Sequence, residues 1–425
     1  MTLMQPLEAA GCGCDALDAT QGLVSIAEAL EEISSWVSNN ENHETVPLDQ
    51  AQGRTLARPV RAQGMTPPFD NSAMDGYAVN TASLVGEGPW KLSVKNSVRA
   101  GGTSAAPVGA GKAVQIFTGA PVPQGADAVI MQEHVLREGD QITLTQRPVS
   151  GAHVRVTGED MATGQEVMPA GRKVGSAEIA VLAAAGCAMV SVNRRPKVAI
   201  LTTGDEVRCA GRELETSAIW DVNSPMLVAA IQNAGGEIVQ VAHGTDNLPD
   251  LRATLEELAE IADVVVTTGG ISVGAADFVK PAIEQLGGDI WFSGVAVKPG
   301  KPVSFGRVGA AYWLGLPGNP VSALVTWTLF GTQILNGLSG ADNGCSKRRH
   351  VVASSELSHR TGRCELRLAT LSGFDGLGRE LVNCPADTQS ARVSRLTDAD
   401  GLVFIPAETE SICEGGLLEF LPFSN

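Results

Sequence analysis

The segment between residues 195 and 340 constrains the fold of this 425-residue chain most strongly. Apolar runs such as PKVAILTTG and DVVVTTGG alternate there with helical stretches, of which 249–262 places Leu251, Leu255 and Leu258 on one side. Strands that are apolar along their whole length are typical of parallel strands covered on both faces. The alternation therefore predicts a doubly wound α/β domain.

The remaining helices of this segment are expected from capping and turn residues. One is expected to open with Ser224 as its N-cap and Pro225 at its first position, and to end at Gly235-Gly236. Others are expected near 278–286 and from 321 to about 338. In doubly wound sheets ligands bind at the carboxyl ends of the strands, and those ends read TTGDE, TTGGISVG, VKPGKP and LPGNP.

Short β-like runs separated by Gly and Pro fill two other parts of the chain. One extends from about 60 to 156 and the other from 341 onward, so each predicts a β domain. Helical text at 24–37 precedes the first, and Ala-rich helical text at 176–186 follows it.

Charge and apolar content exclude several classes of protein. The chain has 31 basic and 47 acidic residues, a formal net charge of −16, which argues against the broad basic surface of a nucleic-acid-binding protein. No apolar run reaches the roughly 18–20 residues that cross a bilayer, and the first twenty residues hold no Lys or Arg. We expect a soluble cytoplasmic protein without a membrane partner.

The strand end VTTGGISVG at 266–274 is a candidate anion-binding loop. Consecutive glycines let backbone N–H groups approach a phosphate, although a tight loop without a ligand explains the same letters. Gly270, Ser272 and Gly274 also fit the nucleophile elbow of a serine hydrolase. That interpretation is disfavoured because the only downstream histidines, His350 and His359, fall in the terminal β segment.

The run KPGKP holds two lysines, Lys298 and Lys301, between prolines. It is not a Walker A loop, because Val295 stands where that loop needs glycine and Pro302 replaces its Ser or Thr. Two stiffly held cations suit a compact dianion, and a solvated basic turn is the alternative.

Acidic loops occur at three places, within 68–78, at 158–160 and at 203–206. Carboxylates that converge beside a polyanionic ligand suggest a divalent cation, and Mg²⁺ prefers such oxygen ligands. Taken singly, each loop could equally be a solvated turn with Asx-type hydrogen bonds.

Longer segments, in this order along the chain, resemble the MoeA family of molybdopterin molybdenumtransferases, which includes the E domain of gephyrin: PFDNSAMDGYAV, IFTGAPVPQGADAVIMQE, VRVTGEDMATG, LTTGDEV, VVVTTGGISVGAADFVK, VKPGKPVSFG and LGLPGNPVSAL. The resemblance covers about residue 23 to the end. It implies a multidomain α/β plus β protein with a MogA-like α/β domain and a C-terminal β-barrel-like domain. The domains expected are an N-terminal extension (1–22), a discontinuous helical domain (23–60 and 157–194), a β insertion (61–156), the α/β domain (195–340) and the C-terminal β domain (341–425).

The resemblance also implies a reaction, in which adenylylated molybdopterin and molybdate give molybdenum cofactor and AMP with Mg²⁺ as cofactor. It implies a homodimer whose active site combines the α/β domain of one subunit with the β insertion of the other, and other molybdenum-cofactor biosynthesis proteins as further partners. Two alternatives stay open, a molybdopterin adenylyltransferase and a non-catalytic molybdopterin-binding scaffold. The residues also leave open the choice between molybdate and tungstate, which have nearly the same size and charge.

Site residues are carried over from the family by position. The expected catalytic residues are Asp75, Asp160, Glu206 and Thr118, with Arg155 orienting the carboxylates. The expected substrate-binding residues are Gly269, Gly270, Ser272, Pro317, Gly318 and Asn319. The expected molybdate-binding residues are Lys298, Lys301, Arg367 and Ser390, and the expected metal ligands are Asp221 and Asp277.

Overall fold

The computed structural model describes residues 22–39, 42–102, 106–211, 213–271, 277–341, 348–385 and 392–423. The chain divides into two compact units, one comprising 1–44 with 193–425 and the other 45–192. Each unit is described by itself below. No helix within the described ranges is long and apolar enough to cross a membrane.

The first unit is built on a six-stranded sheet in the order β16-β13-β17-β21-β20-β18. The first four strands are mutually parallel, and β20 runs antiparallel to both of its neighbours, β21 and β18. The strands are β13 (Lys197–Thr203), β16 (Glu237–Gly244), β17 (Val264–Thr268), β18 (Asp289–Ser293), β20 (Ser304–Val308) and β21 (Ala311–Leu316). The predicted doubly wound, mostly parallel sheet is confirmed.

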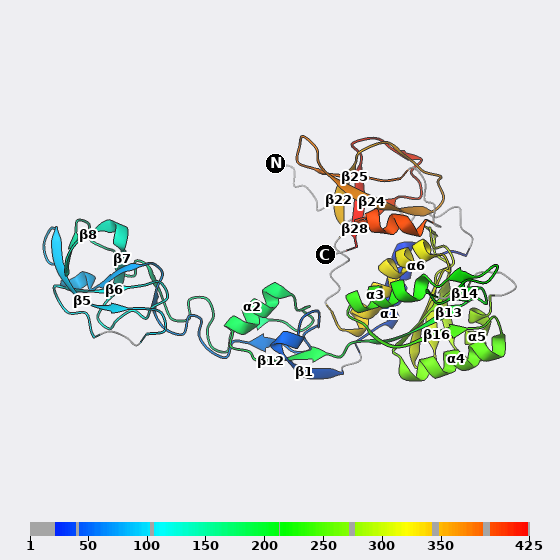
Figure 1. Ribbon diagram of the computed structural model, residues 1–425, viewed down its shortest axis with the longest axis horizontal. Coiled ribbons are helices and arrows are strands. Elements are labelled where there is room, and N and C mark those ends of the chain that lie inside the picture. The colour runs from blue at the N-terminus through cyan, green and yellow to red at the C-terminus, as the bar shows by residue number, and fades with distance from the viewer. Residues whose placement is uncertain are drawn as a thin grey trace, which may run out of the picture. The chain divides into compact units, whose positions relative to one another are not determined.

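Helices cover both faces of this sheet (Figure 1). Val198 and Ile200 of β13 face one layer, whereas the alternating Ala199 and Leu201 face the other, so the strand is apolar along its length. The first layer holds α1 (Ile26–Trp36), α3 (Asn223–Asn233), α6 (Pro320–Thr326) and α7 (Thr332–Leu338), and the second holds α4 (Leu248–Ile261) and α5 (Val279–Gln285).

Two helices differ from their expected form. Helix α3 begins at Asn223, and the Ser224 N–H donates to Asp221 Oδ1 at 2.9 Å, so the prediction of Ser224 as N-cap is wrong. The helix expected from 321 to 338 is interrupted between α6 and α7 by a π-helical segment, Trp327–Gly331. The Trp327 ring lies so close to Gly331 that an added Cβ would be 2.1 Å from it.

Helix α1 packs within the first unit, against the α/β part. Its capping box pairs Ser25 with Glu28, and its apolar face of Ile26, Ala29 and Ile33 joins the core of the α/β part. The Ala-rich helix α2 (Ser176–Ala184) instead belongs to a separate core in the second unit. The expected discontinuous helical domain of 23–60 and 157–194 stays a prediction.

The C-terminal part of the first unit is a closed five-stranded barrel, because β24 pairs with both β25 and β26. Its strands are β22 (Arg349–Ala353), β24 (Cys364–Phe374), β25 (Glu380–Asn383), β26 (Gly401–Ile405) and β28 (Leu417–Pro422), and β23 (Leu357–Ser358) pairs with β27 (Ser411–Ile412). Strand β19 (Val297–Lys298) pairs parallel to β24. This pairing fixes the start of the KPGKP loop against the barrel.

The second unit contains a six-stranded sheet in the order β7-β4-β6-β5-β9-β8. Its strands are β4 (Gly76–Val79), β5 (Trp90–Val98), β6 (Lys112–Ile116), β7 (Ala128–Met131), β8 (Val135–Glu138) and β9 (Gln141–Leu144). Short antiparallel pairs join β3 (Asn71–Ser72) to β10 (Val154–Arg155) and β2 (Val60–Arg61) to β11 (Glu166–Met168). Strand β1 (His43–Pro47) pairs with β12 (Met189–Asn193).

Candidate functional site

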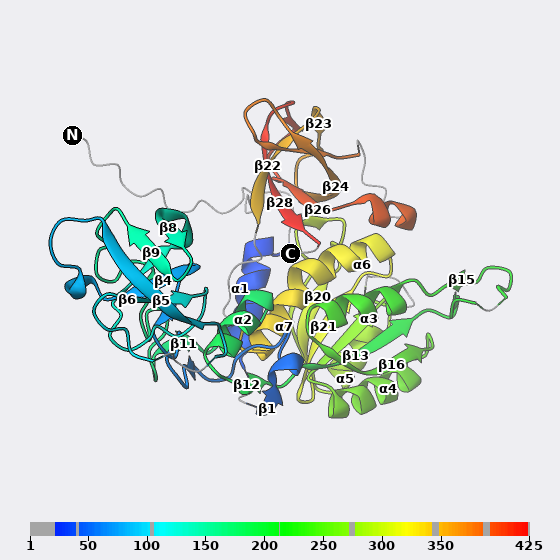
Figure 2. The same ribbon diagram turned by 60° about the vertical axis from the view of Figure 1, so that its left-hand side comes forward.

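The carboxyl ends of three neighbouring parallel strands form the centre of the candidate site. The strand order reverses around β13, whose neighbours β16 and β17 lie on its opposite sides, and such a switch point is where doubly wound sheets bind ligands. Glu206 follows β13, Gly269-Gly270 follows β17, and Pro317-Gly318-Asn319 follows β21. A long excursion between β14 (Val207–Arg208) and β15 (Ile219–Trp220) extends from the same edge (Figure 2).

The two glycine-containing loops are packed against each other. Gly269 and Gly270 have φ values of +90° and +62°, and a Cβ on Gly269 would lie 2.8 Å from Thr203 Oγ1. A Cβ on Gly318 would lie 3.5 Å from the Gly269 Cα. The structure thus brings Gly269 and Gly318, two of the expected substrate-binding residues, close together. The Gly269 N–H donates to the Leu316 carbonyl at 3.2 Å, and Ser272 lies outside the described residues.

Asn223, which the sequence analysis did not single out, ties these loops to α3. Its Nδ2 donates to Thr268 Oγ1 at 2.7 Å and to the Gly318 carbonyl at 2.8 Å. Asn319 caps α6 by accepting the Ser322 N–H at 3.4 Å. In the sequence, Asn223 could have been noticed only as a polar residue at the start of a helix, shortly after a strand.

The predicted acidic residues of this unit lie at different depths. Glu206 is exposed, and Asp221 and Asp277 are half-buried. Burial lowers the pKa of Lys280, whereas the nearby carboxylates of Asp277 and Glu284 act in the opposite direction. Within the described ranges, no group of three or more His, Cys, Asp or Glu side chains is placed to hold a metal ion.

The KPGKP loop presents one paired lysine and one exposed lysine. The register of β19 and β24 places Lys298 beside Glu365, and Lys298 Nζ lies 3.1 Å from Glu365 Oε1. Lys301 is exposed. Gly300, with φ +112°, is packed against α6, where a Cβ would lie 2.4 Å from Thr326 Cγ2.

Arg367 lies behind Glu365, inside the barrel. Arg367 Nη2 lies 3.1 Å from Glu365 Oε2 and donates to the Ser358 carbonyl at 2.5 Å. Arg367 is 3% exposed and Glu365 is 1% exposed, and Arg367 Nε and Nη1 have no hydrogen-bond partner among the described residues. Glu365, which the sequence analysis missed, therefore separates Lys298 from Arg367. Ser390 lies outside the described ranges.

In the second unit, the structure brings two predicted catalytic residues together. The exposed Asp75 carboxylate accepts the Thr118 N–H at 2.7 Å and the Thr118 hydroxyl at 2.8 Å. The backbone bond, followed by the hydroxyl bond, lowers the pKa of Asp75 below its ordinary value of 3.8. Asp160 is exposed, its N–H donates to the Thr66 carbonyl at 2.9 Å, and Arg155 is exposed on β10.

An aspartate that accepts both the N–H and the hydroxyl of one threonine is called a clasp here, and the same loop carries a second one. Asp70 Oδ1 accepts the Thr157 hydroxyl and the Thr157 N–H, both at 2.7 Å, and these bonds lower the pKa of Asp70. Phe69 directly precedes Asp70 and Met74 directly precedes Asp75, and both apolar side chains are exposed. The loop thus exposes both carboxylates and apolar side chains.

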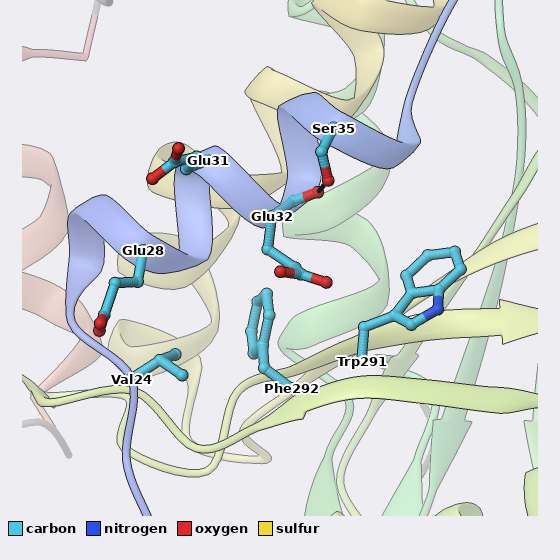
Figure 3. A pocket seen from close by; sticks show the side chains of 7 residues that line it. All are labelled: Val24, Glu28, Glu31, Glu32, Ser35, Trp291 and Phe292. Atoms are coloured by element: carbon cyan, nitrogen blue, oxygen red, sulfur yellow. Dashed lines mark hydrogen bonds between the residues drawn. The ribbon is translucent and has the colours of Figure 1, made fainter.

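A cavity of about 420 Å³ between α1 and β18 contains none of the predicted residues (Figure 3). Its lining is acidic, but Glu28 is used in the capping box of α1, and Glu32 accepts the Trp36 indole N–H at 2.8 Å. The lining residues are Val24, Glu28, Glu31, Glu32, Ser35, Trp291 and Phe292. An acidic lining does not suit an anionic substrate.

Three family descriptions match the chain in succession. The MoeA N-terminal region (domains I and II) matches residues 24–186, a probable molybdopterin-binding domain matches 199–337, and the MoeA C-terminal region (domain IV) matches 351–423. The order of the three matches follows the order of the parts described above.

Named relatives match over most of their length. Molybdopterin molybdenumtransferase 2 of Mycobacterium tuberculosis is 36% identical over 383 residues, which are 88% of this chain and 94% of that protein. Molybdopterin molybdenumtransferase of Bacillus subtilis is 30% identical and covers 94% of each chain. The solved structure of a molybdopterin biosynthesis MoeA protein from Pyrococcus horikoshii has a TM-score of 0.80 at 29% identity, covering 94% of this chain and 100% of that chain.

Proposed function

Since the chain belongs to the MoeA family, we propose that it inserts molybdenum from molybdate into adenylylated molybdopterin and releases AMP. The observation that carries this proposal is the match to relatives named molybdopterin molybdenumtransferase along 94% of their length. That match includes both units, and therefore both the strand-end loops and the Asp75 loop.

The reaction brings two anionic reactants together, and their repulsion has to be offset. Lys298 and Lys301 supply cationic charge from one short loop, and preorganised charge of this kind stabilises developing and bound anions. Arg367 adds a further positive charge to the same region, where it pairs with the other carboxylate oxygen of Glu365. We assign the molybdate subsite to this loop and the phosphates of adenylylated molybdopterin to the loops that contain Gly269 and Gly318.

Asp221 and Asp277 would hold Mg²⁺ together with the phosphates of the substrate. Mg²⁺ is usually bound by one or two carboxylates plus phosphates and waters rather than by an all-protein cage, and the half-buried Asp221 and Asp277 would supply those carboxylates. The ion would neutralise phosphate charge at the leaving group. Asp221 would offer Oδ2, because its Oδ1 accepts the Ser224 N–H.

The exposed carboxylates Asp75, Asp160 and Glu206 are assigned to catalysis. Asp75 is ionised at neutral pH, and its two bonds to Thr118 hold the carboxylate where it can orient an attacking oxygen. Thr118 positions that carboxylate. We further propose that the protein is a homodimer in which this loop serves the strand-end site of the second copy.

The test is AMP release by purified protein from adenylylated molybdopterin, with and without molybdate and Mg²⁺. We expect release only when both are present, and loss of turnover in Asp75→Ala. Asp127→Ala is the matched control, because Asp127 forms a similar clasp with Thr81 elsewhere in the second unit. Full activity of Asp75→Ala would overturn the assignment of Asp75, and consumption of ATP with free molybdopterin would favour an adenylyltransferase instead.

A further inference from the structure

Asn223 is a buried polar side chain at the ends of the parallel strands. It is the first residue of α3 and is 6% exposed. Both hydrogens of its Nδ2 are used, because one bond goes to Thr268 Oγ1 at the end of β17 and the other to the Gly318 carbonyl after β21. The amide thus joins three segments of the strand-end site.

The orientation of this amide follows from its hydrogen-bond partners. The Thr268 hydroxyl donates its single hydrogen to the Pro317 carbonyl at 3.2 Å, so toward Asn223 it acts as an acceptor. The Gly318 carbonyl also only accepts. A flipped amide would place its oxygen against two acceptors, so the nitrogen faces them and the oxygen Oδ1 points elsewhere.

Oδ1 of Asn223 is buried and has no hydrogen-bond partner among the described residues. Buried polar atoms in folded proteins almost always have a partner, and leaving one without a partner costs free energy. The neighbouring hydroxyl of Ser224 is used, since it lies 2.5 Å from Thr202 Oγ1. No described residue supplies a donor to Oδ1, so this oxygen is available to a donor of a ligand or of solvent.

We propose that Asn223 is a further substrate-binding residue, whose Oδ1 accepts a hydrogen bond from an N–H or O–H group of the phosphate-bearing substrate. This inference rests on the proposed function, which places a nucleotide and a pterin phosphate at these loops. A carbonyl oxygen repels phosphate oxygens, so Asn223 recognises the neutral part beside the phosphate, a ribose hydroxyl or a ring N–H. It thereby distinguishes the nucleotide-bearing substrate from a bare phosphate.

The test compares Asn223→Ala with wild type for three ligands, AMP, adenylylated molybdopterin and inorganic pyrophosphate. The matched control is Asn233→Ala, an exposed asparagine at the other end of α3. Direct titration gives the affinities for the first two ligands, and competition against AMP gives that for pyrophosphate. Because Asn223→Ala removes one hydrogen bond to the substrate, we expect it to bind at least one of AMP and adenylylated molybdopterin about tenfold more weakly than wild type. Its affinity for pyrophosphate should be unchanged.

Two results would overturn the proposal. Equal losses for all three ligands would mean that Asn223 only holds the loops together, and unchanged affinity for AMP and adenylylated molybdopterin would mean that Oδ1 meets no substrate group. Asn223→Ser serves the same comparison if the alanine variant does not fold. Failure of the wild-type protein to bind either nucleotide ligand would instead contradict the proposed function itself.

Discussion

The Asp75 carboxylate is held by Thr118 through two hydrogen bonds, from the backbone N–H at 2.7 Å and from the hydroxyl at 2.8 Å. Both bonds stabilise the charged form, and the backbone bond has the larger effect on the pKa. An exposed carboxylate is thereby fixed in position and kept ionised. The clasp joins two loops that are 43 residues apart in the sequence.

Thr118→Ala is expected to raise the pKa of Asp75 only part of the way to its ordinary value, because the backbone N–H remains. Since folding lowers this pKa, the clasp contributes stability above the unfolded carboxyl pKa and loses that contribution as the pH falls through the folded value. Carboxyl-carbon NMR titration measures the shift. Thr118→Ser retains the hydroxyl and should titrate as wild type, and identical titrations of the alanine and wild-type proteins would refute the role of the hydroxyl.

Lys298→Ala and Lys301→Ala are each expected to raise the KM for molybdate by about tenfold, because each removes a charge-assisted contact to the dianion. The KM for adenylylated molybdopterin should change less. Steady-state AMP release at varied molybdate concentration gives these values. Lys91→Ala, an exposed lysine of β5, is the control, and a molybdate KM unchanged in both loop variants would rule out the proposed subsite.

Glu365→Gln is expected to destabilise the first unit by about 3–5 kcal/mol, because it leaves the buried Arg367 guanidinium without its counter-charge. Urea unfolding followed by circular dichroism measures the loss. Glu380→Gln is the comparison, since the Arg349–Glu380 pair is partly exposed and its loss should cost less than about 1 kcal/mol. Equal stabilities of the two variants would show that the buried pair is not required.

Gly269→Ala is expected to weaken AMP binding, because a Cβ at this φ of +90° would lie 2.8 Å from Thr203 Oγ1 and 3.0 Å from the Thr203 carbonyl oxygen. Gly287→Ala provides the backbone control, with φ +71° and no atom within 4 Å of its Cβ. Both variants should lose roughly 1–3 kcal/mol of stability from the left-handed backbone. Calorimetric titration with AMP should separate them, and equal affinities would argue against a binding role for this loop.

The α/β part could be predicted from sequence because its strands are apolar along their length and its helices have a clear apolar side. That signal was weaker for α1, whose apolar face of Ile26, Ala29 and Ile33 indicates burial without indicating the partner. The start of α3 was predicted two residues late, at Pro225 instead of Asn223, because Ser224 resembles a cap although Asp221 accepts its N–H.

Residues that act through pairing across the fold were harder to predict. Glu365 meets Lys298 only because β19 and β24 align two positions that are 67 residues apart. Asn223 likewise depends on Thr268 and Gly318, which come from other strands. A single polar residue in a strand or at a helix start carries no periodic signal, so these contacts become visible only in the folded chain.

The most direct test of the proposed reaction is a single-turnover measurement, in which adenylylated molybdopterin is mixed with excess protein, molybdate and Mg²⁺. The quantity measured is the ratio of AMP released to molybdenum incorporated. We expect one AMP for each molybdenum bound to the dithiolene, and no AMP when molybdate is omitted. Release of AMP at the same rate without molybdate, or molybdenum incorporation without AMP release, would contradict it.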